Sequence, residues 1–271
     1  GIFGIITKED ASYSNQFLKK SLKTLAKLSE TRGKDSSGLC TLNNSDNSFH
    51  VVKGPIPANQ LLTRSKVKKD INQVFSKENN GKLKLAFGHA RLVTNGTQLE
   101  DSNNQPVIKD DIICIHNGIV VNVDDLWEAN NQLKRENEID TEVLPSLIRD
   151  ELNSGSSVES SVKNTLEKVF GTASVALAFN DLNKIVLATN NGSLYVIHNN
   201  KDIVYFASER AMLNGLVEKM SLENEIGSFE LFQLRANELL SLDLESFSFK
   251  CISIFHDMKG KLLLNYGLCS I

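Results

Sequence analysis

The sequence has no long apolar run and no excess of charge of either sign. No apolar stretch approaches the roughly 20 residues that a membrane-spanning helix needs, and no charged-then-apolar leader opens the chain. The 30 Lys and Arg residues nearly balance the 33 Asp and Glu residues, which leaves a net charge of -3. Because nothing favours a general affinity for nucleic acid or anionic membranes, we expect no nucleic-acid or membrane partner.

Cysteine is also scarce, and its spacing excludes two further classes. The four cysteines lie far apart and form no Cys-x-x-Cys within the chain: Cys40, Cys114, Cys251 and Cys269. This spacing argues against a zinc ribbon and against a compact disulfide framework. We therefore expect a cytoplasmic protein, and we interpret the two glycosylation-like triplets at Asn95 and Asn191 as turns.

What the sequence does contain is the pattern of a layered α+β protein. A strand is predicted over residues 1–7, and Leu18, Leu22 and Leu25 have the spacing of an amphipathic helix. After a turn over residues 31–38, alternating runs around Cys40 and His50 indicate a hairpin. Strands are also predicted over residues 82–93 and 110–121, and a short helix near residues 209–216. Further strands gather in two blocks, with three helices predicted between residues 123 and 170, which favours sheets covered by helices.

Five short segments carry the candidate chemistry, and each alone is an ordinary turn or cap. They are GIFGI (Gly1 to Ile5), RGKDSSG (Arg32 to Gly38), GHARLVTNG (Gly88 to Gly96), HNGI (His116 to Ile119) and DTE (Asp140 to Glu142). In this order and at these intervals they resemble the class II glutamine amidotransferases. The likeness is strongest to the glutaminase domains of the glucosamine-6-phosphate synthases. It is clear over residues 1 to about 145 and weaker to about residue 215.

The resemblance implies an N-terminal nucleophile (Ntn) hydrolase fold, a four-layer αββα sandwich of two antiparallel sheets. It also implies a single type 2 glutamine amidotransferase domain over residues 1–271. In that interpretation residues 255–271 form a C-terminal tail or the start of a linker to a synthase module.

The resemblance also assigns roles to individual residues. Glutamine carries a carboxylate, an ammonium group and an amide, so its pocket needs a cation, an anion and hydrogen-bond donors. By resemblance, Arg91 holds the carboxylate with Thr94 nearby, and Asp140 accepts from the ammonium group. The Asn117 side chain and the Gly118 backbone N–H stabilise the oxyanion. Arg32 supports the nucleophile, and Asp35 has a mainly structural role.

The expected nucleophile is a Cys directly before Gly1, whose thiol attacks the amide while its α-amino group acts as the base. The sequence begins at Gly1, which leaves a modified Cys, a cut chain or an inactive relative as explanations; a chain starting at Gly1 should not hydrolyse glutamine. Cys114 and His116 alternate along one strand and could form a Cys/His pair. A core Cys and a hydrogen-bonded His are the favoured interpretation of these two residues.

Taken together, the residues predict hydrolysis of L-glutamine to L-glutamate and ammonia, with no cofactor. His89 and His116 have no recognisable zinc spacing, so no metal is expected. The ammonia would pass to an acceptor-binding synthase domain or subunit, of sugar isomerase type or ATP-dependent amidotransferase type. Asn95 and Leu92 depart from the synthase pattern, which leaves the acceptor open. Two alternatives remain: an inactive glutamine-binding regulatory subunit, and an autoproteolytic hydrolase acting on another amide.

Overall fold

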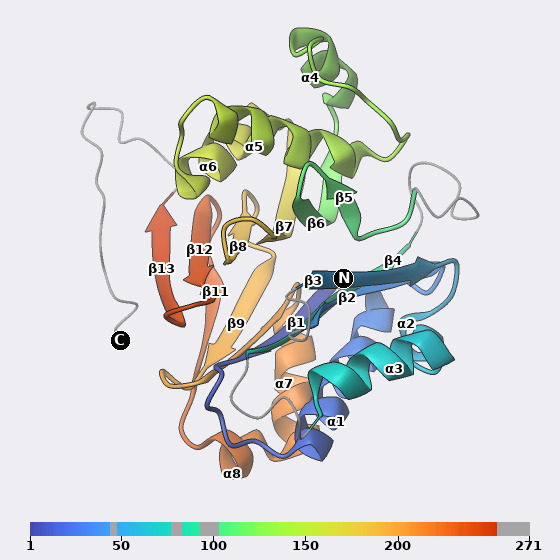
Figure 1. The fold of residues 1–271 in the computed structure, drawn as a ribbon, viewed down its shortest axis with the longest axis vertical. Coiled ribbons are helices and arrows are strands. Elements are labelled where there is room, and N and C mark those ends of the chain that lie inside the picture. The colour runs from blue at the N-terminus through green and yellow to red at the C-terminus, as the bar shows by residue number, and fades with distance from the viewer. Residues whose placement is uncertain (44–47, 77–82, 93–102, 254–271) are drawn as a thin grey trace. The chain divides into compact units, whose positions relative to one another are not determined.

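The computed structural model describes residues 1–43, 48–76, 83–92 and 103–253 (Figure 1). The chain divides into two compact units, each formed by two stretches of sequence. Unit 1 comprises Gly1–Pro106 and Tyr195–Gln233, and unit 2 comprises Val107–Leu194 and Leu234–Ile271. Each unit is built on one antiparallel sheet. No helix in the described part of the chain is long and apolar enough to cross a membrane.

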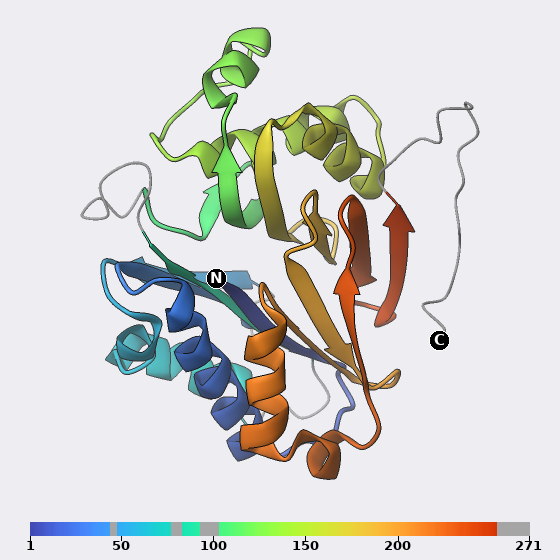
Figure 2. The same cartoon turned by 180° about the vertical axis from the view of Figure 1, so that it is seen from behind.

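Unit 1 contains a seven-stranded sheet in the order β11-β9-β10-β1-β4-β2-β3. Its strands are β1 (Ile2–Thr7), β2 (Ser36–Asn43), β3 (Ser48–Gly54), β4 (Lys84–Arg91), β9 (Leu194–His198), β10 (Ile203–Ala207) and β11 (Glu230–Leu234). Its helices are α1 (Asn15–Ser29), η1 (Glu30–Arg32), α2 (Ala58–Leu61), α3 (Ser65–Val74), α7 (Arg210–Met220) and α8 (Leu222–Ile226). Helices α1, α3 and α7 cover one face of this sheet (Figure 2).

The predicted first strand and first helix are both confirmed. β1 lies between β4 and β10, and all six of its residues are buried. α1 begins after Ser14, whose hydroxyl accepts a hydrogen bond from the Phe17 N–H at 3.1 Å and so caps the helix. The predicted leucines are buried on the face of α1 that packs against the sheet.

Unit 2 contains a six-stranded sheet in the order β13-β12-β8-β7-β6-β5. Its strands are β5 (Val107–Lys109), β6 (Ile112–Val120), β7 (Gly171–Phe179), β8 (Lys184–Thr189), β12 (Glu238–Asp243) and β13 (Ser248–Ser253). Its helices are α4 (Val123–Ala129), η4 (Asp140–Glu142), α5 (Val143–Asn153) and α6 (Val158–Lys168). Helices α5 and α6 pack side by side over the sheet (Figure 1).

Two antiparallel sheets with packed helices confirm the predicted α+β class, with three local corrections. β2 already starts at Ser36, so the turn before it is shorter than predicted. The sequence predicts a strand that begins at Asp110 and does not predict β5, whereas β6 begins at Ile112. Asp110 and Asp111 both have positive φ, 50° and 61°, and form the tight turn that joins β5 to β6. α7 also extends to Met220, beyond the predicted end near residue 216.

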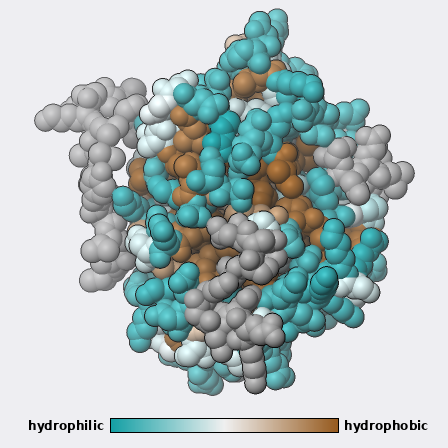
Figure 3. All heavy atoms as spheres, viewed as in Figure 1, coloured by the Kyte–Doolittle hydropathy of each residue, from teal (hydrophilic) through white to brown (hydrophobic). Residues whose placement is uncertain are grey.

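On the face drawn in Figure 3 the surface is mostly hydrophilic, with apolar residues exposed in scattered patches. The exposed large apolar residues among those described are Leu92, Ile108, Ile119, Val121, Phe170 and Leu182.

Candidate active site

Three of the five motif segments meet in unit 1, around the first residue of the chain. Gly1 is buried, and its nitrogen donates a hydrogen bond to the Ala90 carbonyl oxygen. A Cβ placed on Gly1 would lie 2.7 Å from Arg32 Cγ and 2.9 Å from Met212 Cε. The RGKDSSG segment is joined to the same place, because the Asp35 N–H donates to the Arg91 carbonyl oxygen at 3.1 Å.

The surroundings of the Gly1 nitrogen disfavour a positive charge. Burial, and then the Arg32 guanidinium, lower the pKa of the Gly1 α-amino group to about 4, although Glu209 acts in the opposite direction. Arg32 itself forms an ion pair with Glu209, with 2.8 Å between Nη1 and Oε1. The structure therefore places Arg32 beside Gly1, which is where the sequence predicts a supporting residue.

Arg91 ends β4 and is buried, with only 6% of its surface exposed. Its Nη1 donates to the Asn103 carbonyl oxygen at 2.6 Å, so part of its hydrogen-bonding capacity is engaged within unit 1. Residues 104–106, next to Asn103, are held by Lys53. Its Nζ donates to the carbonyl oxygens of Asn104 at 2.7 Å and Pro106 at 3.1 Å. Thr94, predicted to assist Arg91, lies outside the described residues.

The other two motif segments meet in unit 2, where β6 carries Asn117 and Gly118. The Asn-Gly pair is not the hairpin turn that is its most common setting, since both residues lie inside β6 and pair with Ser174 and Ala173 of β7. Gly118 has a φ of 151°, and a Cβ there would lie 1.9 Å from the Thr172 carbonyl oxygen. Glycine is therefore required at this position.

The hydrogen-bond pattern of the sheet shows where the Gly118 N–H points. The backbone N–H and C=O of Ala173, its partner on β7, both bond to Asn190, at 2.7 and 2.9 Å, and so face away from β6. In an antiparallel ladder such a pair is not hydrogen-bonded, so the Gly118 N–H points to the edge of β6 opposite β7. At Gly118 this edge of β6 is not paired with β5, because β5 pairs only with residues 112–114.

Asp140 lies on the same edge of β6. It begins η4, is 7% exposed, and its Oδ2 accepts a hydrogen bond from the Val120 N–H at 2.9 Å. Val120 and Gly118 are two residues apart, so their N–H groups point the same way along the strand. The structure thus brings the predicted ammonium-binding carboxylate and the predicted oxyanion donor together.

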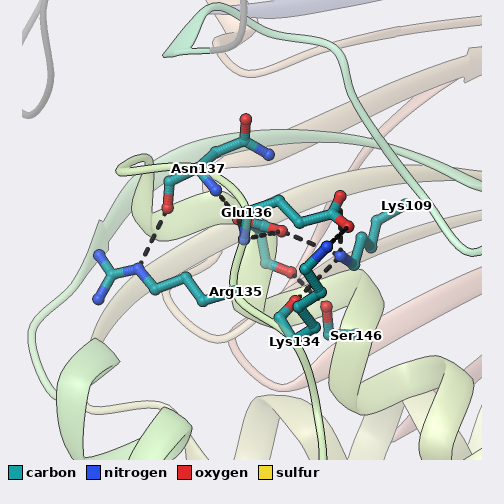
Figure 4. A network of polar contacts seen from close by, with 7 residues as sticks. Lys109, Lys134, Arg135, Glu136, Asn137 and Ser146 are labelled. Carbon is teal, nitrogen blue, oxygen red and sulfur yellow. Dashed lines mark hydrogen bonds and ion pairs between the residues drawn. The ribbon is translucent and has the colours of Figure 1, made fainter.

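Sequence reasoning missed Glu142, the third residue of the DTE motif. Its carboxylate is fully buried and accepts from the backbone N–H groups of Glu136, at 2.9 Å, and Asn137, at 2.6 Å. Lys109 of β5 pairs with Glu142 at 3.2 Å and with Glu136 at 3.1 Å, in the network drawn in Figure 4. Burial opposes the charge on Lys109, but its hydrogen bonds to these two carboxylates outweigh burial and raise its pKa. Glu142 therefore anchors η4, and with it Asp140, to β5.

The internal Cys114 and His116 do not form a nucleophilic pair. Cys114 is fully buried in the core under α5, and burial, with a smaller effect from the Asp140 charge, raises the pKa of its thiol. The His116 ring is hydrogen-bonded elsewhere, to Thr141 and to the Thr172 carbonyl oxygen. The favoured interpretation, a core Cys and a hydrogen-bonded His, is confirmed.

Among the described residues, no group of three or more His, Cys, Asp or Glu side chains is arranged to hold a metal ion. The absence of a metal and of a cofactor in the working protein stays a prediction.

Comparison with known proteins shows what the fold resembles. A glutamine amidotransferase domain family matches residues 89–215. Two solved structures, each 20% identical, superpose on 94% of the chain and on 49% of their own length. They are the glutamine phosphoribosylpyrophosphate amidotransferase of B. subtilis, with a TM-score of 0.65, and the allosteric regulatory enzyme of purine biosynthesis, with a TM-score of 0.67. The fold is that of the Ntn-hydrolase amidotransferases.

Curated relatives agree. The isomerizing glutamine–fructose-6-phosphate aminotransferase of Zymomonas mobilis is 28% identical over 83% of the chain and 34% of the relative's length. That of Sulfolobus acidocaldarius is 28% identical over 84% of the chain and 33% of the relative. The chain spans about a third of the length of the curated relatives it matches. The motifs, the domain family and these relatives thus agree in their likeness to the glutamine amidotransferases.

Proposed function

We propose that this domain hydrolyses L-glutamine to L-glutamate and ammonia. The observation that carries the proposal is the edge of β6, where the Gly118 N–H and the Asp140 carboxylate lie together beside Asn117. Donors fixed before the reaction stabilise the charge that develops on the amide oxygen, and each contributes about 2.7–4 kcal/mol to such a transition state. Asp140 would take the substrate ammonium, and Arg91 its carboxylate.

The nucleophile in this proposal is a Cys joined to Gly1. Its chain would continue from the buried Gly1 nitrogen, beside Arg32 and Glu209. An α-amino group acts as a base only when it is neutral, and burial next to a guanidinium is the kind of environment that keeps an amine neutral. The thiol would attack the amide carbon, ammonia would leave, and water would then hydrolyse the acyl-enzyme.

The acceptor of the ammonia in this proposal is a synthase module that makes an amino sugar. The support is that both relatives described above are glutamine–fructose-6-phosphate aminotransferases and that the chain matches about a third of each. The remaining two thirds of such a protein would hold the sugar phosphate, so we expect the module on the same polypeptide or on a partner subunit.

The test is a glutaminase assay on the full-length protein, with N-terminal sequencing of the same sample, followed by three variants. Asn117→Ala should lower kcat at least 100-fold with little change in KM, as expected for loss of one oxyanion donor. Arg91→Ala should mainly raise KM. Asp140→Ala should remove the preference for glutamine over glutaric acid monoamide, which lacks the ammonium group. Glutamine binding without ammonia release from a protein that carries the Cys would overturn the proposal and favour a glutamine-binding regulatory subunit.

A further inference from the structure

The His116 ring joins three segments of unit 2 that are far apart in the sequence. It lies on β6, is 2% exposed, and its Nδ1 is 3.3 Å from Thr141 Oγ1 of η4. Its Nε2 is 3.2 Å from the Thr172 carbonyl oxygen of β7. Thr141 is itself fully buried. One imidazole thus connects the strand of the oxyanion donors to the short helix that begins with Asp140.

The partners of the ring fix its tautomer. A carbonyl oxygen can only accept, so Nε2 carries the hydrogen and donates to Thr172. In the neutral ring Nδ1 then accepts the hydroxyl hydrogen of Thr141. Each ring nitrogen therefore has one role, donor at Nε2 and acceptor at Nδ1, and the two hydrogen bonds together fix the orientation of the ring.

The bridge adds a second attachment between η4 and β6. The first is the Asp140 carboxylate on the Val120 N–H, and His116 and Val120 stand on either side of Gly118 along the strand. The carbonyl of Thr172 that accepts from His116 is also the atom that a Cβ at Gly118 would meet first. Glu142 anchors the other end of η4 to β5, and the two attachments on alternate residues of β6 fix the end that carries Asp140 relative to Gly118.

We propose that His116 is a positioning residue that sets the place of the Asp140 carboxylate relative to the oxyanion donors, and so makes the enzyme selective for amides that carry an α-ammonium group. This inference rests on the proposed glutaminase function. His116 acts through Thr141 and Asp140 and does not touch the substrate. Its loss should therefore change selectivity between two amides, and not only the overall rate.

The experiment compares kcat/KM for glutamine and for glutaric acid monoamide in the full-length protein. Thr141→Val removes only the hydroxyl hydrogen bond and keeps the side-chain shape. It should lower the glutamine preference about tenfold, and His116→Ala should lower it at least as much. The double variant should lose little more, because both changes break the same bridge. Thr141→Ser, which keeps the hydroxyl, should restore most of the preference.

An unchanged preference in Thr141→Val and His116→Ala, with only thermal stability lowered, would overturn the positioning role. If the parent protein releases no ammonia, it is the glutaminase proposal that fails. In that case ¹⁵N NMR of the His116 ring still tests the bridge. The Nε2–H tautomer is expected, with an Nδ1 resonance that shifts in Thr141→Val. An Nδ1–H tautomer, or a resonance that does not respond to Thr141→Val, would overturn the bridge itself.

Discussion

The two units share a plan, an antiparallel sheet with helices packed on it, but they hold their candidate site residues in different ways. In unit 2, Asp140, Thr141 and Glu142 are buried, and each is hydrogen-bonded within the unit. In unit 1, Arg91 is buried as well, but Arg32, beside Gly1, is 44% exposed and pairs with Glu209, which is 35% exposed. Loss of a buried contact that leaves a polar group without a partner is costly, whereas exposed ion pairs contribute little. Substitutions at the buried contacts of unit 2 should therefore lower stability far more than substitutions at the Arg32–Glu209 pair of unit 1.

The largest effect on stability and activity together is expected at Gly118. In Gly118→Ala the new methyl group would lie 1.9 Å from the Thr172 carbonyl oxygen, at a φ of 151° that L-residues rarely adopt. The strand must move, which should lower the free energy of unfolding by about 1–3 kcal/mol and displace an oxyanion donor. Glutaminase kcat/KM should fall roughly 100-fold or more. Urea denaturation and an ammonia assay measure the two effects.

The matched control is Gly54→Ala in unit 1, because a Cβ there meets no atom within 4 Å. Its free energy of unfolding should stay within about 0.5 kcal/mol of the parent. Equal losses in the two variants would show that the close contact at Gly118 is not what makes its glycine necessary.

Next in size is the buried carboxylate of Glu142. Glu142→Gln removes the negative charge opposite Lys109 and weakens the acceptor for the N–H groups of Glu136 and Asn137. The free energy of unfolding should fall by about 1.5–3 kcal/mol, the range for hydrogen bonds to a charged group. Glu136→Gln is the natural control, because Glu136 pairs with the same Lys109 but is 48% exposed. Its effect should be clearly smaller, and a reversed order would contradict the comparison between buried and exposed contacts.

Which of these features the sequence could predict depends on how far apart in the sequence the contacting residues lie. β1, α1 and β6 follow from local apolar periodicity, and the five motifs follow from short strings of residues. The β5 hairpin was missed because its turn uses Asp110 and Asp111, without the glycine that signals such turns. The bridge from His116 to Thr172 joins residues 56 positions apart. No periodicity encodes that contact, so only the folded chain shows it.

A pH-dependent effect is expected in unit 1, at His198 of β9. This side chain is 1% exposed and packs edge-on against Phe232, with the ring centroids 5.5 Å apart. Burial lowers its pKa from 6.5, and Glu230 and Asn200 only partly oppose the shift. Above about pH 6.5 the ring is neutral in both folded and unfolded chains, so it adds no pH dependence. Below that pH the unfolded chain takes up the proton first, and stability should fall as the pH falls.

The measurement is the free energy of unfolding between pH 7.5 and 5.5. One proton contributes a slope of at most about 1.4 kcal/mol per pH unit. His198→Gln should flatten the slope in this window. Glu230→Gln should keep it, since removing that carboxylate withdraws an influence that raises the pKa of His198. If His198→Gln has the slope of the parent, the titration belongs to other groups.

The smallest effect is expected at the ion pair beside Gly1. Glu209→Gln breaks the 2.8 Å pair with Arg32 while keeping the size of the side chain. Since both side chains are more than a third exposed, the free energy of unfolding should change by less than about 1 kcal/mol, and less still in high salt. Activity should be the more sensitive readout. Glu209 is the only one of the three causes of the Gly1 amine shift that favours the charged form, so Glu209→Gln should lower the pKa of an amine at this position further. With a Cys joined to Gly1, the Gly1 nitrogen is an amide and the titrating α-amino group is that of the Cys, one residue further toward the N-terminus. By the same reasoning, the acidic limb of the glutaminase pH profile should move to lower pH in Glu209→Gln. An acidic limb that stays where it is in the parent would mean that Glu209 does not act on the amine, and a shift to higher pH would mean that it acts in the opposite direction.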